Sequence, residues 1–152
     1  MTTTAHKQKN KTQPVPDNHT IGGLIGWSYV DGANRGVVAI EDIKSGTEIE
    51  CSPVLVTPTD DYTAVHGRKT VVDDYLLAWE DKGEEIEYAI GFGYLMLYNH
   101  SANANADFRW NYPAKEITVF VTRDVKAGEE LTIDYAVPLW FQPRELVSND
   151  RD

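Results

Sequence analysis

Short apolar or alternating runs, separated by turn-forming residues, constrain the fold of this chain more than any other feature. In one run, Ile117, Val119 and Val121 alternate with Thr118 and Phe120, which is the pattern of a strand with one buried face. Similar runs predict strands at 37–40, 47–56, 71–79, 87–91, 117–122 and 131–134. Helix is scarce, and only 94–98 indicates a short one. The sequence therefore predicts a mainly β domain made of several small curved sheets.

One turn pattern occurs twice. It reads Ile-Lys-Ser-Gly-Thr-Glu-Ile at 43–49 and Val-Lys-Ala-Gly-Glu-Glu-Leu at 125–131. The two copies share an apolar residue, a lysine, a glycine, a glutamate and a second apolar residue at matching positions. We expect Gly46 and Gly128 to adopt a positive φ in tight turns that lead into strands. Two copies are too few for a solenoid repeat.

The length and composition indicate one globular domain. A chain of 152 residues with 41% hydrophobic residues can bury a core of its own. Residues 1–20 are polar and lack hydrophobic periodicity, which predicts a disordered N-terminal tail. We expect an ordered domain over 21–136 and a C-terminal tail over 137–152. The single cysteine, Cys51, excludes an internal disulfide and lies in an apolar run, where we expect it to be buried.

The formal net charge of −10 restricts the partners of the chain. An acidic surface repels phosphate groups, which argues against direct nucleic-acid binding, and it attracts basic proteins or peptides. An acidic surface that only maintains solubility explains the charge equally well. No stretch approaches the roughly 18–20 apolar residues that span a bilayer, and the N-terminus lacks an apolar signal segment. These features predict an intracellular protein without membrane contact, and they leave a homodimer open.

Two short motifs carry the candidate chemistry. Asn-His-Ser at 99–101 follows an apolar run, and Asp-Tyr at 134–135 ends a predicted strand. With the segments 34–39 and 75–77 they occur in the order found in the SET-domain lysine methyltransferases, which the chain resembles over 26–135. It is most similar to small stand-alone viral and bacterial members without pre-SET or zinc-binding post-SET regions.

The resemblance implies the β-clip SET fold with a C-terminal pseudoknot, in which the last segment passes beneath a loop. It also implies S-adenosylmethionine as cofactor. Residues at the matching positions would hold this cofactor: Arg35, Gly36, Val37, Asn99, His100, Tyr135 and Trp140. Trp140 lies in the 137–152 tail, which resembles the aromatic tail that closes the pocket in small SET proteins.

The activity implied is methyl transfer to the side-chain amine of a lysine in a basic protein, such as a histone or histone-like tail. Tyr135 would be the main catalytic residue, assisted by Tyr75. The lysine channel would be lined by Tyr75, Tyr98, Phe108 and Ile133. A phenylalanine at 108 leaves room for di- or trimethylation. No metal site is expected, because the four histidines lack ligand spacing.

A catalytically inactive SET-fold interaction module is the alternative. The sequence departs from the family pattern at Asn34, Ala102 and Ala104, and it has two additional residues near Tyr94 relative to that pattern. These departures bear on whether the cofactor binds. A nucleic-acid methyltransferase conflicts with the acidic charge and with the lack of a dinucleotide-type glycine fingerprint. The sequence leaves open the substrate, the target lysine and the number of methyl groups.

Overall fold

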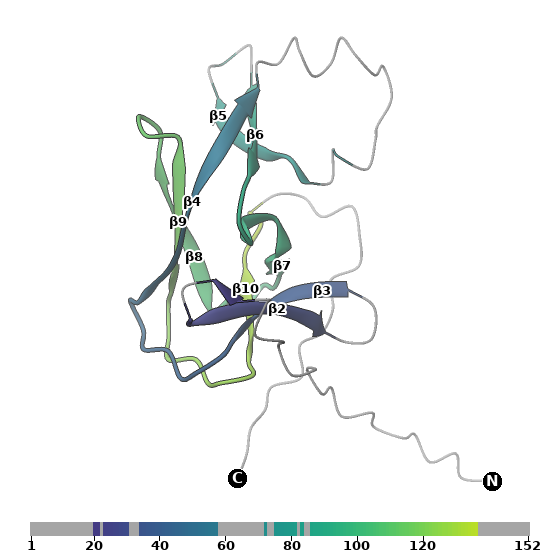
Figure 1. Cartoon of the computed structure of the whole chain (residues 1–152). Helices are drawn as coiled ribbons and strands as arrows, with labels where there is room; N and C mark the ends of the chain where they lie inside the picture. The colour runs from purple at the N-terminus through teal and green to yellow at the C-terminus, as the bar shows by residue number, and fades with distance from the viewer. Residues whose placement is uncertain are drawn as a thin grey trace, which may run out of the picture.

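The computed structural model describes residues 20–21, 23–30, 34–57, 72, 75–81, 83 and 86–136 (Figure 1). The tails predicted at 1–20 and 137–152 lie outside these residues except for Thr20, and so does Trp140. The described residues form two five-stranded sheets with very little helix, so the predicted mainly β fold is confirmed.

The first sheet has the strand order β1-β2-β3-β10-β7. Its strands are β1 Thr20–Ile21, β2 Ile25–Val30, β3 Asn34–Ala39, β10 Glu130–Ile133 and β7 Asn99–His100. The last strand, β10, lies between two earlier ones: it pairs antiparallel with β3 and parallel with β7. The end of the domain is thus inserted between segments from its beginning and middle, which agrees with the threaded arrangement expected.

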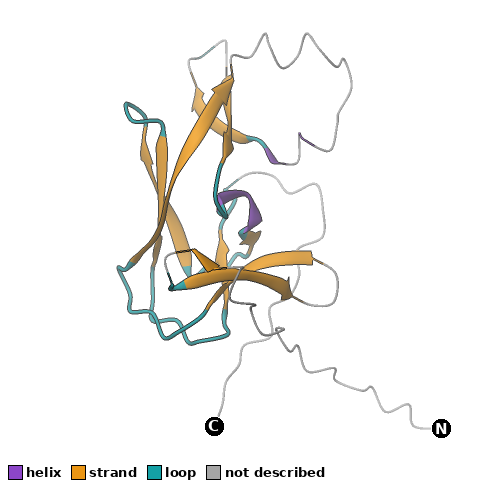
Figure 2. Cartoon of the chain, in the orientation of Figure 1, coloured by secondary structure: helices purple, strands orange, loops and turns teal. Residues whose placement is uncertain are grey.

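The second sheet has the order β5-β6-β4-β9-β8 and is antiparallel throughout. Its strands are β5 Leu77–Asp81, β6 Ile86–Gly91, β4 Glu48–Thr57, β9 Glu116–Val121 and β8 Ala106–Asn111. The helix expected at 94–98 is the single 3-10 turn η3, Leu95–Leu97, which lies between the two sheets (Figure 2). It joins β6 of the second sheet to β7 of the first.

The core forms from the inward faces of these strands. Ile117, Val119 and Val121 are fully buried while the residues between them are partly exposed, so the predicted alternation is confirmed. Leu131 and Val37, which pair across β10 and β3, are also fully buried. Burial of apolar side chains from both sheets in one cluster ties the sheets together.

Two predictions from the apolar runs are wrong. The strand predicted at 71–79 begins only at Leu77, where pairing with Ala89 of β6 starts, and Val72 and Tyr75 lie in 3-10 conformation before it. Cys51 is exposed, because it points to the outer face of β4 while its neighbours Glu50 and Ser52 point inward. Strands β2, β7 and β8, which contain glycine or polar residues, were not predicted from the runs.

The repeated turn pattern forms a paired structure. Gly46 and Gly128 have φ of 83° and 80°, as predicted. The apolar residues that start the two copies, Ile43 and Val125, form an antiparallel bridge in which each N–H donates to the other carbonyl at 2.9 Å. The copies therefore face one another, and each turn leads into a strand, β4 or β10.

An aspartate precedes each copy of the pattern and forms hydrogen bonds with the turn of the other copy. Lys44 Nζ donates to Asp124 at 2.6 Å, and Lys126 Nζ donates to Asp42 at 2.6 Å. Asp124 also accepts from the N–H of Ser45, and Asp42 accepts from the corresponding N–H of the other turn. The lysine contact, followed by the backbone N–H, lowers the pKa of both carboxyl groups below their ordinary value of 3.8.

These paired turns predict a pH dependence of stability. Because the folded-state pKa of Asp42 and Asp124 is lowered, their stabilising contribution is present above the unfolded pKa of 3.8 and is lost as the pH falls through the folded-state pKa. The melting temperature should therefore fall less steeply from pH 5 to pH 3 in the Asp42→Asn, Asp124→Asn double variant than in the parent. Circular dichroism melts check this, with Glu41→Gln as control for a neighbouring exposed carboxylate. Parallel pH profiles for the parent and the double variant would contradict it.

Candidate active site

Tyr135 follows the end of β10 and contacts a segment far away in the sequence. Its hydroxyl donates a hydrogen bond to the backbone oxygen of Tyr98 at 2.9 Å, across 37 positions. Its backbone N–H donates to Nδ1 of His100 at 3.2 Å, and the two rings lie 5.3 Å apart. The two motifs singled out in the sequence therefore meet in one place.

The backbone next to Tyr135 is unusual. Ala136 has φ of 51°, a left-handed conformation that few residues other than glycine adopt. Its N–H donates to the Asp134 carboxylate at 2.9 Å, which closes a tight turn around Tyr135. Tyr135 itself is 37% exposed.

His100 forms a hydrogen bond with the backbone of Tyr135. Its side chain is only 7% exposed. Because Nδ1 accepts the N–H of Tyr135, that nitrogen carries no proton. Asp134 lies 3.7 Å from the same nitrogen, which is beyond hydrogen-bond distance, so Tyr135 rather than Asp134 is the hydrogen-bond partner of this nitrogen.

The Asn99 side chain is held by two acceptors. Its Nδ2 donates to the backbone oxygen of Arg35 at 3.0 Å and to Oε1 of Glu130 at 2.7 Å. Both amide protons are thereby engaged, and the carbonyl oxygen Oδ1 is the remaining polar atom of the side chain, an acceptor. β3, β7 and β10 each contribute one of the three residues, so these three neighbouring strands of the first sheet together fix the orientation of the amide.

Gly36 is required by the packing around this amide. A Cβ built at Gly36 would lie 2.7 Å from Glu130 Oε1, 2.8 Å from Asn99 Nδ2 and 2.9 Å from a Val30 methyl group. The family resemblance implied that Gly36 is one of the residues that hold the cofactor. In the structure, the space beside the glycine is occupied by the asparagine and glutamate side chains.

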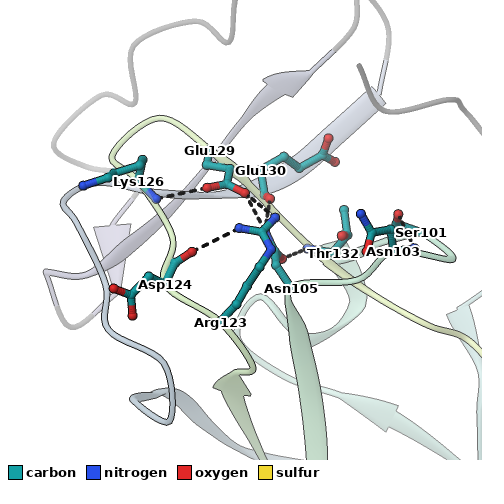
Figure 3. Close-up of polar contacts among 9 residues, drawn as sticks. All are labelled: Ser101, Asn103, Asn105, Arg123, Asp124, Lys126, Glu129, Glu130 and Thr132. Atoms are coloured by element: carbon teal, nitrogen blue, oxygen red, sulfur yellow. Dashed lines mark hydrogen bonds and ion pairs between the residues drawn. The ribbon is translucent and has the colours of Figure 1, made fainter. Parts of the chain in front are cut away.

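Asn105 joins β10 to the loop after β7. Its side chain is 2% exposed. Oδ1 accepts the N–H of Thr132 at 2.9 Å, and Nδ2 donates to the backbone oxygen of Glu130 at 2.8 Å (Figure 3). Nδ2 also donates to the Glu129 carboxylate at 3.2 Å. The Asn105 side chain thereby forms with Thr132 and Glu130 the hydrogen bonds that the backbone of a neighbouring strand would otherwise form.

Glu129 connects this asparagine to the surface. Burial alone would raise its pKa, but the Arg123 guanidinium at 2.6 Å, the N–H of Lys126 and the amide of Asn105 together hold that pKa below its usual value. Figure 3 shows these groups converging on one carboxylate. The glutamate is therefore charged at neutral pH and fixes the start of β10.

Asn105 gives a prediction of its own. Replacing it with alanine removes the acceptor of the buried N–H of Thr132 and a donor to the carbonyl of Glu130, which should destabilise the fold by about 2–4 kcal/mol. Urea unfolding followed by fluorescence measures this. Asn103→Ala is the control, because Asn103 is exposed and contributes only its backbone N–H, to Ser101. Equal stability of the two variants would contradict the assignment.

Other residues predicted for the site lie as follows. Phe108 on β8 packs edge-on against the Tyr98 ring at 6.4 Å. Ile133 is 4% exposed and pairs with His100, and Val37 is fully buried within β3. Tyr75 lies just before β5 and is 41% exposed. Hydrogen bonds join Tyr135 to Tyr98 and His100, and Asn99 to Arg35. The functional roles of all these residues stay predictions.

Glu50 was not predicted from the sequence, although it is a buried carboxylate in contact with Tyr98. It is 6% exposed and accepts hydrogen bonds from the hydroxyl of Ser52 at 2.6 Å, the N–H of Tyr94 at 2.7 Å and the hydroxyl of Tyr98 at 2.9 Å. Burial, followed by the charge of Glu50, raises the pKa of Tyr98 well above its ordinary value of 10.0. Period-two spacing on one inward face with Ser52 and Val54 could have identified it.

Comparisons with known proteins agree with this geometry. The family model described as "SET domain" matches residues 34–136. The chain is therefore a member of the SET-domain family. It is 34% identical over 108 residues to the histone-lysine N-methyltransferase of Schizosaccharomyces pombe described as H3 lysine-37 specific, covering 71% of this chain and 70% of that protein. Family and relative together support the class of protein-lysine methyltransferases.

A solved structure shows the same fold. A Plasmodium falciparum protein proposed to be a histone methyltransferase superposes with a TM-score of 0.58 at 22% identity, over 80% of this chain and all of that one. Within the described part of the chain, no helix is long and apolar enough to cross a membrane. The same residues contain no cluster of three or more histidine, cysteine, aspartate or glutamate side chains suited to a metal.

Proposed function

We propose that this chain transfers a methyl group from S-adenosylmethionine to the side-chain amine of a lysine in a basic protein such as a histone. The observation that carries the proposal is the meeting of Tyr135 with Tyr98 and His100 through two hydrogen bonds. A phenol hydroxyl after the end of β10 and a backbone carbonyl oxygen before the start of β7 are thereby brought together. Such oxygens stabilise positive charge that develops on an amine without offering a competing nucleophile.

The residues present fit the cofactor. S-adenosylmethionine carries an ammonium group, and the Oδ1 of Asn99 is an acceptor whose orientation is fixed by its two engaged amide protons. Arg35, Gly36, Val37, His100, Tyr135 and Trp140 are the further residues proposed to hold it. When bound, the cofactor supplies a methyl group activated by a positively charged sulfur.

The lysine must be neutral to react. With an unperturbed pKa near 10.4, only about one lysine side chain in 2,500 is neutral at pH 7. A nearby positive charge and partial desolvation lower that pKa. Tyr135, assisted by Tyr75, would align the amine, while Tyr98, Phe108 and Ile133 would line its channel. The sequence offers no general base, so the proton is proposed to leave through water.

The charge of the chain supports a basic substrate. A net charge of −10 attracts a basic peptide and speeds its arrival. The fission yeast relative is described as specific for a lysine of histone H3. We therefore propose a histone or histone-like tail as substrate, which places the protein inside the cell, in the cytoplasm or the nucleus.

Calorimetric titration with S-adenosylmethionine separates the enzyme from an inactive module of the same fold. The enzyme should bind the cofactor with a dissociation constant below the millimolar range. Lack of any binding heat at millimolar ligand would favour the inactive module. Mass spectrometry after exhaustive reaction then counts the methyl groups, and di- or trimethyl-lysine is expected because Phe108 lacks a hydroxyl.

A further inference from the structure

Among the residues that the structure describes, Glu50 is a buried carboxylate for which the proposed reaction gives no role. We propose that it is a positioning residue for methyl transfer: through the hydroxyl of Tyr98 it fixes the carbonyl oxygen that orients the hydroxyl of Tyr135. The inference rests on the proposed function and adds a residue that belongs to neither motif. Two hydrogen bonds connect Glu50 on β4 to Tyr98 and Tyr98 to Tyr135.

The carboxylate of Glu50 holds both ends of one turn. Its Oε1 accepts the N–H of Tyr94, which precedes η3, and its Oε2 accepts the hydroxyl of Tyr98, which follows η3. A single side chain from β4 therefore sets the distance between the start and the end of the turn. Because hydrogen bonds to a charged acceptor are stronger than neutral ones, this restraint is firm.

The close approach of Glu50 depends on a glycine. A Cβ built at Gly93 would overlap Oε1 of Glu50 and lie 2.6 Å from the hydroxyl oxygen of Ser52. Gly93 also has φ of 68°, which disfavours other residues. The backbone before η3 is thus shaped so that the carboxylate can reach it.

Tyr98 transmits the restraint. Its ring is buried, at 2% exposure, and its hydroxyl is bound to Glu50 at one end of the residue. At the other end, its backbone oxygen accepts the hydroxyl of Tyr135 at 2.9 Å. Because the pKa of Tyr98 is raised, its hydroxyl stays protonated and remains a donor. A shift of the Tyr98 ring would therefore move the oxygen that orients Tyr135.

Ser52 provides a matched comparison. Its exposure of 4% is close to that of Glu50 and Tyr98, and its hydroxyl donates to the Glu50 carboxylate at 2.6 Å. It does not belong to the series of contacts that runs from Glu50 through Tyr98 to Tyr135. Removing the hydroxyl of either Ser52 or Tyr98 takes one hydrogen bond from Glu50. Only the loss at Tyr98 interrupts the path to the hydroxyl of Tyr135.

The test compares Tyr98→Phe with Ser52→Ala in the full chain. Kinetics use S-adenosylmethionine and histone H3, calorimetry gives the dissociation constant of the cofactor, and thermal melts report stability. Tyr98→Phe should lower kcat by roughly 10- to 100-fold, since small displacements of aligned groups have effects of this size. The cofactor dissociation constant should change less than about threefold, because the Asn99 contacts are untouched. Ser52→Ala should lower the melting temperature similarly and leave kcat within about twofold of the parent.

Variants of Glu50 provide a second arm. Glutamine can still accept the N–H of Tyr94 and can donate to the Tyr98 hydroxyl, so Glu50→Gln should lose much less kcat than Glu50→Ala. Equal kcat values for Tyr98→Phe and Ser52→Ala would overturn the inference, as would parallel loss of kcat and cofactor affinity in Tyr98→Phe. If the parent chain itself neither bound the cofactor nor methylated lysine, the proposed function would fail first, and that result is visible without any variant.

Discussion

Replacing Tyr135 with phenylalanine should lower kcat for methyl transfer by at least about 100-fold, because the hydroxyl is the only group removed and it faces the reacting amine in the proposed site. The phenyl ring can still lie beside His100, and the backbone N–H of residue 135 can still donate to Nδ1 of that histidine. The cofactor dissociation constant should therefore change by less than about threefold. Steady-state kinetics with labelled cofactor and calorimetric titration measure the two effects separately.

Tyr112→Phe is the control for this substitution, since Tyr112 follows β8 and is 46% exposed. It should leave both kcat and cofactor affinity unchanged. If Tyr135→Phe reduced kcat and cofactor affinity by the same factor, Tyr135 would be a structural residue. Retention of full activity would remove it from the mechanism altogether.

Gly36→Ala should weaken cofactor binding by at least about tenfold and destabilise the fold by about 1–3 kcal/mol. The added methyl group would lie 2.8 Å from the Asn99 amide and 2.7 Å from the Glu130 carboxylate, closer than ordinary contacts allow. Because the amide must move, its carbonyl oxygen would no longer be held toward the cofactor. Calorimetry measures the affinity, and urea unfolding measures the stability.

Gly46→Ala separates this effect from general backbone strain. Gly46 has φ of 83°, which alanine adopts with difficulty, but its surroundings leave space for a Cβ. This variant should be destabilised while its cofactor affinity stays that of the parent. Unchanged affinity in Gly36→Ala would mean that the Asn99 amide is not part of the cofactor site.

The sequence predicted those parts of the fold that depend on local patterns. The alternation of Ile117, Val119 and Val121 identified a half-buried strand, and the two glycine turns adopt the expected positive φ. Where tertiary contacts decide, local patterns failed. β5 begins only where β6 offers a partner, at Leu77, and Cys51 is exposed because one residue of offset changes the face of a strand.

Local sequence patterns identified the two motifs of the candidate site, at 99–101 and 134–135. They did not identify the hydrogen bonds that join Tyr135 to His100 and Tyr98. The pairing of β10 with β7, which brings Tyr135 beside His100, depends on a parallel contact between distant segments that no local signal shows. Glu50 was missed because a glutamate in an apolar run resembles a surface residue of a strand. Its burial becomes intelligible only when the hydroxyl of Tyr98 and the N–H of Tyr94 are placed beside it.

Transfer of labelled methyl from S-adenosylmethionine to histone H3, followed by mass spectrometry of the modified peptide, tests the central claim most directly. The parent chain should place methyl groups on a lysine side chain, and the Tyr135→Phe variant should place almost none under the same conditions. Binding of the cofactor by the parent chain without methylation of any lysine, in histone H3 or in a whole-cell lysate, would contradict the account.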